Sequence, residues 1–145
     1  MEGRYLEFCN KSWAFDPEEI KSIEGGLMQV QTEIYKDLNP YVFWRHEWSR
    51  HGTCAAVFEP FNTQLKYFSK GIEWNQKYSL TDMLEAANIF PSDTTYLEPE
   101  EVANAVQAVI KKSPMIGCFV IDDVPYLQEV RICLDKEFNL IDCNR

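Results

Sequence analysis

The side chains best suited to acid–base chemistry are concentrated in one stretch, FWRHEWSRHGTC, which spans residues 43–54. Both histidines of the 145-residue chain, His46 and His51, lie in this stretch. The ordinary pKa of histidine is about 6.5, so an imidazole can take or give a proton in mildly acidic solution. Glu47 and Arg50 add a carboxylate and a lasting positive charge beside the imidazoles. The stretch therefore holds the groups that cleavage of a phosphodiester requires.

A helix would gather these groups on one face. At about 100° per residue, His46, Arg50, Glu47 and His51 fall within an arc of roughly 140°. His46 and Arg50 are four residues apart, as are Glu47 and His51, which is the spacing of side chains in contact on a helix. Phe43 lies in the same arc one turn earlier, where its ring could stack on a nucleic-acid base.

Three interpretations of this face compete. A solvated polar face is the plainest, but the aromatic neighbours and the lack of histidine elsewhere argue against it. A zinc site is disfavoured because His46 and His51 are five residues apart, diverge by about 140° on a helix, and flank the cation Arg50. The third is RNA cleavage, which needs a base for the 2′-hydroxyl, an acid for the leaving oxygen and donors for the charged phosphorus. His51 with Glu47 could supply the base, and Arg50 with His46 the donors, without metal or cofactor.

The remaining sequence predicts helices first and strands late. Asp16-Pro17-Glu18-Glu19 is typical of a helix start, and we expect that helix to be interrupted near Gly25-Gly26. Trp44 and Trp48 point away from the polar arc, so we expect them in the core. Further helices are expected over residues 43–56, 61–77, 81–88 and 99–112, and strands in MIGCFVI, LQEVRICLD and FNLIDC, with a turn at Asp122-Asp123. The pattern predicts an α+β fold with an antiparallel sheet flanked by several helices.

Length and composition favour one domain over residues 1–145, with 46% apolar residues and no repeat or linker. No run of about 18 apolar residues indicates a membrane span, and the start lacks the layout of a signal peptide. The net charge of −9 would ordinarily argue against a polyanionic partner. The positive charge is nevertheless concentrated around residues 45–51, and an acidic compartment would protonate both histidines.

The five cysteines are scattered and odd in number. They form no C-x-x-C zinc pattern, and their density somewhat favours an oxidised framework. At least one thiol therefore is free, pairs between chains, or has its partner outside the sequence. Asn10-Lys11-Ser12 is an acceptor sequence for N-glycosylation, which fits a secretory route.

The segment HEWSRHGTC resembles the second active-site segment of the ribonuclease T2 family, which reads His-Glu-Trp-x-Lys-His-Gly-Thr-Cys. EGRYLEFC near the start and RICLDKEFNLIDC near the end extend the likeness over essentially the whole chain. The resemblance implies that His51 is the catalytic base, that Glu47 stabilises the transition state, that His46 contacts phosphate and that Phe43 helps to bind a base. Arg50 stands where the family usually has lysine, and the planar guanidinium group of arginine is not equivalent to the compact ammonium group of lysine.

The resemblance also implies that the chain is incomplete at both termini. The family's first active-site segment, His-Gly-Leu-Trp-Pro, whose histidine is the general acid, has no counterpart here. The family's disulfides map to Cys9 with Cys54 and to Cys133 with Cys143, leaving Cys118 to pair downstream of Arg145. A buried, unpaired Cys118 is the alternative.

We therefore expect a metal-independent endoribonuclease that cleaves single-stranded RNA through a 2′,3′-cyclic phosphate to 3′-phosphate ends. The alternative is a catalytically incomplete relative that binds RNA or protein. We expect a monomer without a membrane or metal partner, located outside the cell or in a lysosomal or other endomembrane lumen.

Overall fold

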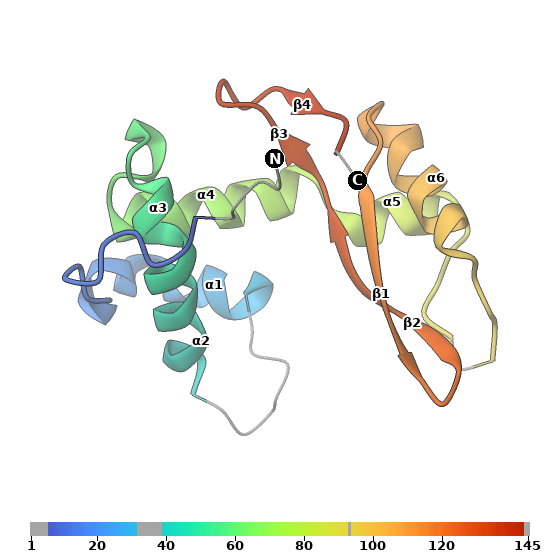
Figure 1. Cartoon of the computed structure of the whole chain (residues 1–145), viewed down its shortest axis with the longest axis horizontal. Coiled ribbons are helices and arrows are strands. Elements are labelled where there is room, and N and C mark those ends of the chain that lie inside the picture. Colours follow the sequence, from blue (N-terminus) through green and yellow to red (C-terminus); the bar gives the residue numbers. More distant parts are fainter. Residues whose placement is uncertain (1–5, 32–38, 93, 144–145) are drawn as a thin grey trace. The chain divides into compact units, whose positions relative to one another are not determined.

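The chain divides into two compact units, residues 1–77 and residues 78–145 (Figure 1). The structure is a computed structural model that describes residues 6–31, 39–92 and 94–143. The described part of the first unit is helical, and the second unit combines α-helices with antiparallel strands. This arrangement confirms the predicted α+β class. The expectation of a single domain over residues 1–145 stays a prediction.

The first helical segment of unit 1 begins where the sequence predicts it. The Asp16 side chain accepts a hydrogen bond from the Glu18 amide, and Pro17 opens a 3-10 helix, η1 (Pro17–Ile23). The predicted interruption near Gly25-Gly26 lies slightly earlier in the chain, because both glycines are inside α1 (Glu24–Val30). The geometry instead changes from 3-10 to α where η1 meets α1. Gly26 faces Ile72 across the unit, so its missing side chain serves helix packing and does not end the helix.

The stretch that carries the histidines is helical but not regular. It consists of α2 (Pro40–Glu47), a π-helical turn η2 (Trp48–Gly52) and the short α3 (Thr53–Ala55). The Asn39 side chain accepts a hydrogen bond from the amide of Tyr41 and so caps α2. Part of the predicted helix over residues 43–56 is therefore wider than an α-helix, with bonds that reach back five residues.

The longest helix of unit 1 supports this stretch. A 3-10 turn, η3 (Glu59–Phe61), precedes α4 (Gln64–Lys77), and Figure 1 shows α4 running at a steep angle to α2. Gln64, Phe68 and Ile72 recur every four residues, and this stripe of α4 faces inward. The buried hydrophobic cluster of the unit consists of Phe15, Ile20, Leu27, Trp44, Trp48 and Phe68. The prediction that both tryptophans lie in the core is confirmed.

Unit 2 begins with two helices that pack together, α5 (Leu80–Ala86) and α6 (Pro99–Ile110). The side chains of Glu98 and Glu101 form a reciprocal capping box at the start of α6. Lys111 takes a left-handed conformation with φ 59° and ends the helix, so α6 stops before the predicted residue 112. Among the described residues, no helix has the length and apolar character needed to cross a membrane.

The strands follow α6 in antiparallel pairs. β1 (Met115–Ile121) pairs with β2 (Val124–Arg131), and β3 (Cys133–Leu134) pairs with β4 (Leu140–Ile141). Asp122 and Asp123, with φ of 49° and 62°, make the tight turn of the first hairpin, which confirms the predicted turn. Figure 1 shows α6 beside this hairpin, and α6 contacts β1. Met83, Val106 and Ile110 form the buried cluster of the unit.

Candidate active site

Two buried tryptophans fix the orientation of the segment that carries the histidines. Trp44 and Trp48 are completely buried. The Trp44 indole N–H donates to the Gln31 carbonyl oxygen at 2.8 Å, and the Trp48 indole N–H donates to the Trp13 carbonyl oxygen at 3.3 Å. Because both indoles are anchored inward, the opposite side of α2 and η2 is turned to solvent.

Gly52 ends the π turn and packs tightly against Trp48. A Cβ atom on Gly52 would lie 2.2 Å from Cε3 of Trp48, so the buried indole needs the hydrogen side chain at this position. The Thr53 amide donates to the Trp48 carbonyl oxygen five residues earlier, which is the bond that defines the π turn. The Thr53 hydroxyl donates to the Ser49 carbonyl oxygen at 3.0 Å and closes the segment.

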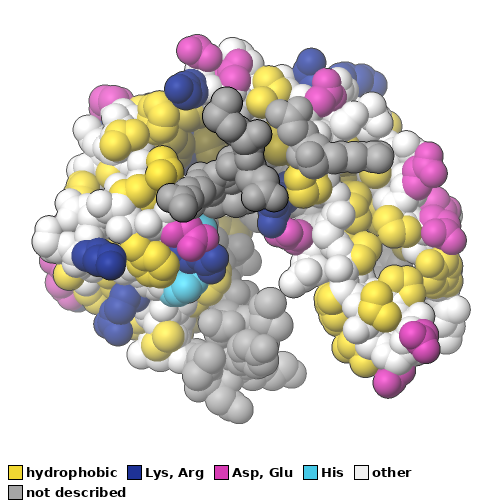
Figure 2. Space-filling model, in the orientation of Figure 1, with side chains coloured by type: hydrophobic (Ala, Val, Ile, Leu, Met, Phe, Trp, Pro, Cys, Tyr) yellow, Lys and Arg dark blue, Asp and Glu magenta, His cyan; other side chains and the backbone are white. Residues whose placement is uncertain are grey.

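The π turn also changes how the two imidazoles are related. The expected divergence of about 140° assumed a regular α-helix through both residues. His46 lies in α2 and His51 lies in the π turn, so the projection of one regular α-helix does not hold between them. Both side chains are exposed. Figure 2 shows histidine at the surface beside basic and acidic side chains.

Arg50 is engaged by a residue that the sequence did not single out, Glu7. Arg50 Nε and Nη2 donate to the same carboxylate oxygen of Glu7, at 2.9 and 2.6 Å. These bonds are the largest effect and lower the pKa of the Glu7 carboxyl below its ordinary value. Desolvation, the next largest effect, opposes them, and the charges of Arg50, His51 and His46 add smaller lowering effects. Glu7 therefore lies within the electrostatic reach of Arg50 and of both imidazoles.

Glu47 lies close to a second residue that the sequence analysis missed, Tyr67 of α4. Burial raises the pKa of the Tyr67 phenol far above its ordinary value, and the Glu47 carboxylate raises it further. The Tyr67 ring packs edge-on against Trp48 at a centroid distance of 5.6 Å. The neutral phenol of Tyr67 thus lies near the half-buried carboxylate of Glu47, which is predicted to take part in catalysis.

Phe43 has a position between solvent and core. Its side chain is half-buried and packs against the hydrophobic cluster of unit 1. Part of the ring therefore serves packing, and base stacking by the exposed part stays a prediction. Within the described ranges, no group of three or more His, Cys, Asp or Glu side chains could hold a metal ion.

The disulfides match the pairing implied by the resemblance. Cys9 is bonded to Cys54 and Cys133 to Cys143. Cys118 is free and exposed, so the alternative of a buried thiol is wrong. Asn10 is also exposed, in a turn where its side-chain oxygen accepts from the Ser12 amide at 3.1 Å.

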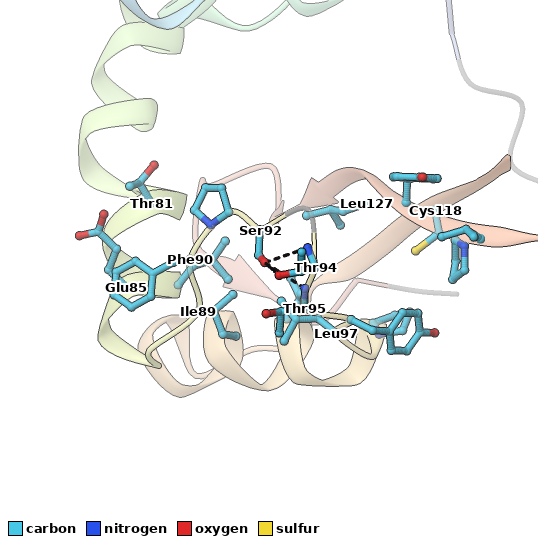
Figure 3. Close-up of a pocket in the computed structure, with 18 residues that line it drawn as sticks. Thr81, Glu85, Ile89, Phe90, Ser92, Thr94, Thr95, Leu97, Cys118 and Leu127 are labelled. Carbon is cyan, nitrogen blue, oxygen red and sulfur yellow. Dashed lines mark hydrogen bonds between the residues drawn. The ribbon is translucent and has the colours of Figure 1, made fainter.

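A hollow of about 750 Å³ lies elsewhere, within unit 2 (Figure 3). Its lining is mainly apolar and includes Phe90, Leu97 and Leu127. Figure 3 shows the Ser92 hydroxyl bonded to its neighbours in the same loop, and it accepts from the Thr95 amide at 2.9 Å. Glu85 is the one charged residue among the described lining residues, and it is an anion. The described lining of the hollow therefore lacks the cations that phosphate chemistry needs, whereas Arg50 of unit 1 carries one.

An α+β fold with imidazole, carboxylate and guanidinium groups on one helical segment fits the class of ribonucleases. The sequence profile of the Ribonuclease T2 family matches residues 1–143, and the chain belongs to this family.

Known proteins resemble the chain over nearly all its length. It is 35% identical to "Ribonuclease Oy" of Magallana gigas over 99% of the chain and 69% of that protein. "Ribonuclease T2" of Homo sapiens is 32% identical, and the match covers 90% of the chain and 52% of that protein. The human crystal structure has a TM-score of 0.90 at 31% identity, over 97% of this chain and 72% of that one. RNase NT in complex with 5′-AMP has a TM-score of 0.84 at 26% identity, and the match covers 97% of this chain and 68% of that chain.

Proposed function

We propose that the chain is a metal-independent endoribonuclease that cleaves single-stranded RNA through a 2′,3′-cyclic phosphate to a 3′-phosphate. The observation that supports this proposal is that His46, Glu47, Arg50 and His51 lie on one short helical segment whose two indoles are completely buried, with both imidazoles exposed. Membership of the Ribonuclease T2 family and the likeness to a nuclease solved with 5′-AMP support the same substrate class.

In the first step, His51 accepts the proton of the ribose 2′-hydroxyl. The 2′-oxygen then bonds to phosphorus, and the bond from phosphorus to the 5′-oxygen breaks. Arg50 and His46 donate hydrogen bonds to the phosphoryl oxygens as their negative charge grows, and Glu47 stabilises the protonated His51. In the second step, water opens the cyclic phosphate to a 3′-phosphate.

The leaving 5′-oxygen must take a proton, and the two imidazoles of this chain already have other roles. When the 145-residue polypeptide is assayed by itself, solvent would supply that proton. Because a positioned acid typically contributes about 10²- to 10⁴-fold in rate, we expect the 145-residue chain to be slow. The competing hypothesis is that the chain binds RNA without cleaving it. The experiment below distinguishes the two.

The experiment uses a single-stranded RNA oligonucleotide near pH 5 with excess EDTA. We expect cleavage with cyclic-phosphate termini in the wild type, and its loss in His51→Gln, which keeps the size and polarity of the side chain. RNA binding without cleavage in both proteins would favour the non-catalytic relative. Cleavage that EDTA abolishes would contradict the metal-independent mechanism.

The disulfides and the glycosylation sequence also support an oxidising location. The chain has two disulfides and an exposed glycosylation sequence at Asn10. A relative from Solanum lycopersicum is named "Extracellular ribonuclease LE". We therefore propose an extracellular or endomembrane-lumen protein, testable by release of an Asn10-linked glycan with an endoglycosidase.

A further inference from the structure

Glu7 holds the guanidinium of Arg50 by one of its two edges. Arg50 Nε and Nη2 both donate to Oε1 of Glu7, at 2.9 and 2.6 Å. An arginine has five N–H donors in a rigid plane, so a carboxylate on the Nε side leaves the Nη1 side able to bind a second anion. The ion pair thus fixes the plane of the guanidinium without using all its donors.

The backbone around Glu7 is itself tied to the π turn. The Phe8 amide donates to the Arg50 carbonyl oxygen at 2.9 Å. One residue further, Cys9 is bonded to Cys54. Residues 7–9 are thus attached to Arg50 of η2 at two points and to Cys54 of α3 at a third. These attachments hold the backbone of Glu7 in place, although its side chain is 33% exposed.

The chemistry of arginine explains why the orientation of its side chain must be fixed. A lysine ammonium is nearly a point charge and can meet a phosphate from many directions, whereas a guanidinium must present its edge in the plane of the phosphate oxygens. Arg50 also carries rotamer freedom that binding of an anion would have to remove. A carboxylate that is already bonded to Nε and Nη2 removes that freedom in advance.

We propose that Glu7 is a positioning residue that aims the free edge of Arg50 at the scissile phosphate. This inference rests on the proposed function and deepens it, because it assigns the orientation of Arg50 to a residue 43 positions away in the sequence. The charged groups that face the Glu7 carboxylate are Arg50, His51 and His46, and Glu47 acts on the same guanidinium.

The test measures binding of inorganic phosphate near pH 6, followed by the NMR signal of the Arg50 side-chain Nε–H. We expect Glu7→Gln to weaken phosphate binding about fivefold, although the substitution removes a negative charge, because a contacting pair contributes energy of this order. Glu7→Asp keeps the carboxylate and should recover part of the loss. Glu59→Gln is the matched control, since it breaks another exposed ion pair of unit 1, with Lys66, and should leave the dissociation constant unchanged.

A second set of variants separates the orientation of Arg50 by Glu7 from a general structural effect of Glu7. In an Arg50→Lys background, Glu7→Gln should change phosphate affinity less than about twofold, since an ammonium needs no aiming. Tighter phosphate binding in Glu7→Gln would overturn the inference, because Glu7 would then compete with phosphate for Arg50. An equal loss in both backgrounds would also overturn it. If the wild type fails to bind phosphate at Arg50, the proposed function itself is contradicted.

Discussion

The indole ring of Trp48 lies against Gly52 so closely that a Cβ atom on residue 52 would be 2.2 Å from Trp48 Cε3. The contact links the core of unit 1 to its surface, because Trp48 is completely buried and both residues bound the π turn. His51 and Arg50 lie inside this turn. The position of two predicted catalytic groups therefore depends on a packing contact behind them.

Gly52→Ala should destabilise the protein, since the added methyl cannot fit without moving the indole. Overpacking in a dense core costs about 1–3 kcal/mol. Gly25→Ala is the control: Gly25 is helical and exposed, with open space at its Cβ position, so the substitution should stabilise the protein by about 0.5–1 kcal/mol. Urea unfolding measures both changes. Equal stability of Gly52→Ala and wild type would show that the π turn does not depend on this contact.

The two disulfides should differ in their contribution to stability. Cys9–Cys54 closes a sequence separation of 45 residues and Cys133–Cys143 one of 10. In the chain-entropy account, their removal costs about 4 and about 3 kcal/mol respectively. We expect the double serine variant of the first pair to unfold at a lower temperature than that of the second. The opposite order would indicate that strain or residual structure outweighs loop length.

The Glu7–Arg50 ion pair should make the free energy of unfolding depend on pH. The pKa of Glu7 is lowered in the folded protein, chiefly by its bonds to Arg50, so its carboxylate favours folding above the ordinary pKa of 4.5. That contribution is lost as the pH falls through the lowered pKa. The difference in unfolding free energy between wild type and Glu7→Gln should therefore shrink as the pH is lowered from about 6 to about 2. A difference that stays constant over this range would contradict the ion pair.

The two histidines should affect different kinetic constants. His51→Ala removes the proposed base and should lower kcat by about 10²- to 10⁴-fold. His46→Ala removes a phosphate donor and should act more on KM. Lys21→Gln, which breaks an exposed ion pair with Glu18, controls for the loss of a cation from unit 1 and should change neither constant. The same large fall in kcat for both histidine variants would mean that His46 also takes part in proton transfer.

Local signals were enough to predict most elements. The start of η1 at Pro17 follows from the capping by Asp16, and the first hairpin follows from Asp122 and Asp123, which accept positive φ. Both signals act within a few residues, so a single sequence reveals them. The predicted strand in MIGCFVI coincides with β1 for the same reason.

Most features that were missed depend on contacts between distant segments. The π turn is a local exception, in which Trp48 packs against Gly52 four residues later, whereas the helical projection assumed one period throughout. Glu7 meets Arg50 across 43 residues. The implied Cys9–Cys54 pairing could have indicated this contact, because it brings the neighbours of both cysteines together. No local sequence pattern identifies Tyr67, because its raised pKa depends on burial and on the Glu47 carboxylate.

The chemistry is tested most directly by removing the proposed nucleophile from the substrate. The substrate is a single-stranded oligodeoxynucleotide that contains one internal ribonucleotide, incubated with the protein near pH 5 in EDTA. Attack by a 2′-hydroxyl predicts cleavage only on the 3′ side of that ribonucleotide, with a cyclic phosphate on the new end, and an intact all-deoxy control. Cleavage of the all-deoxy strand at a similar rate would contradict the account.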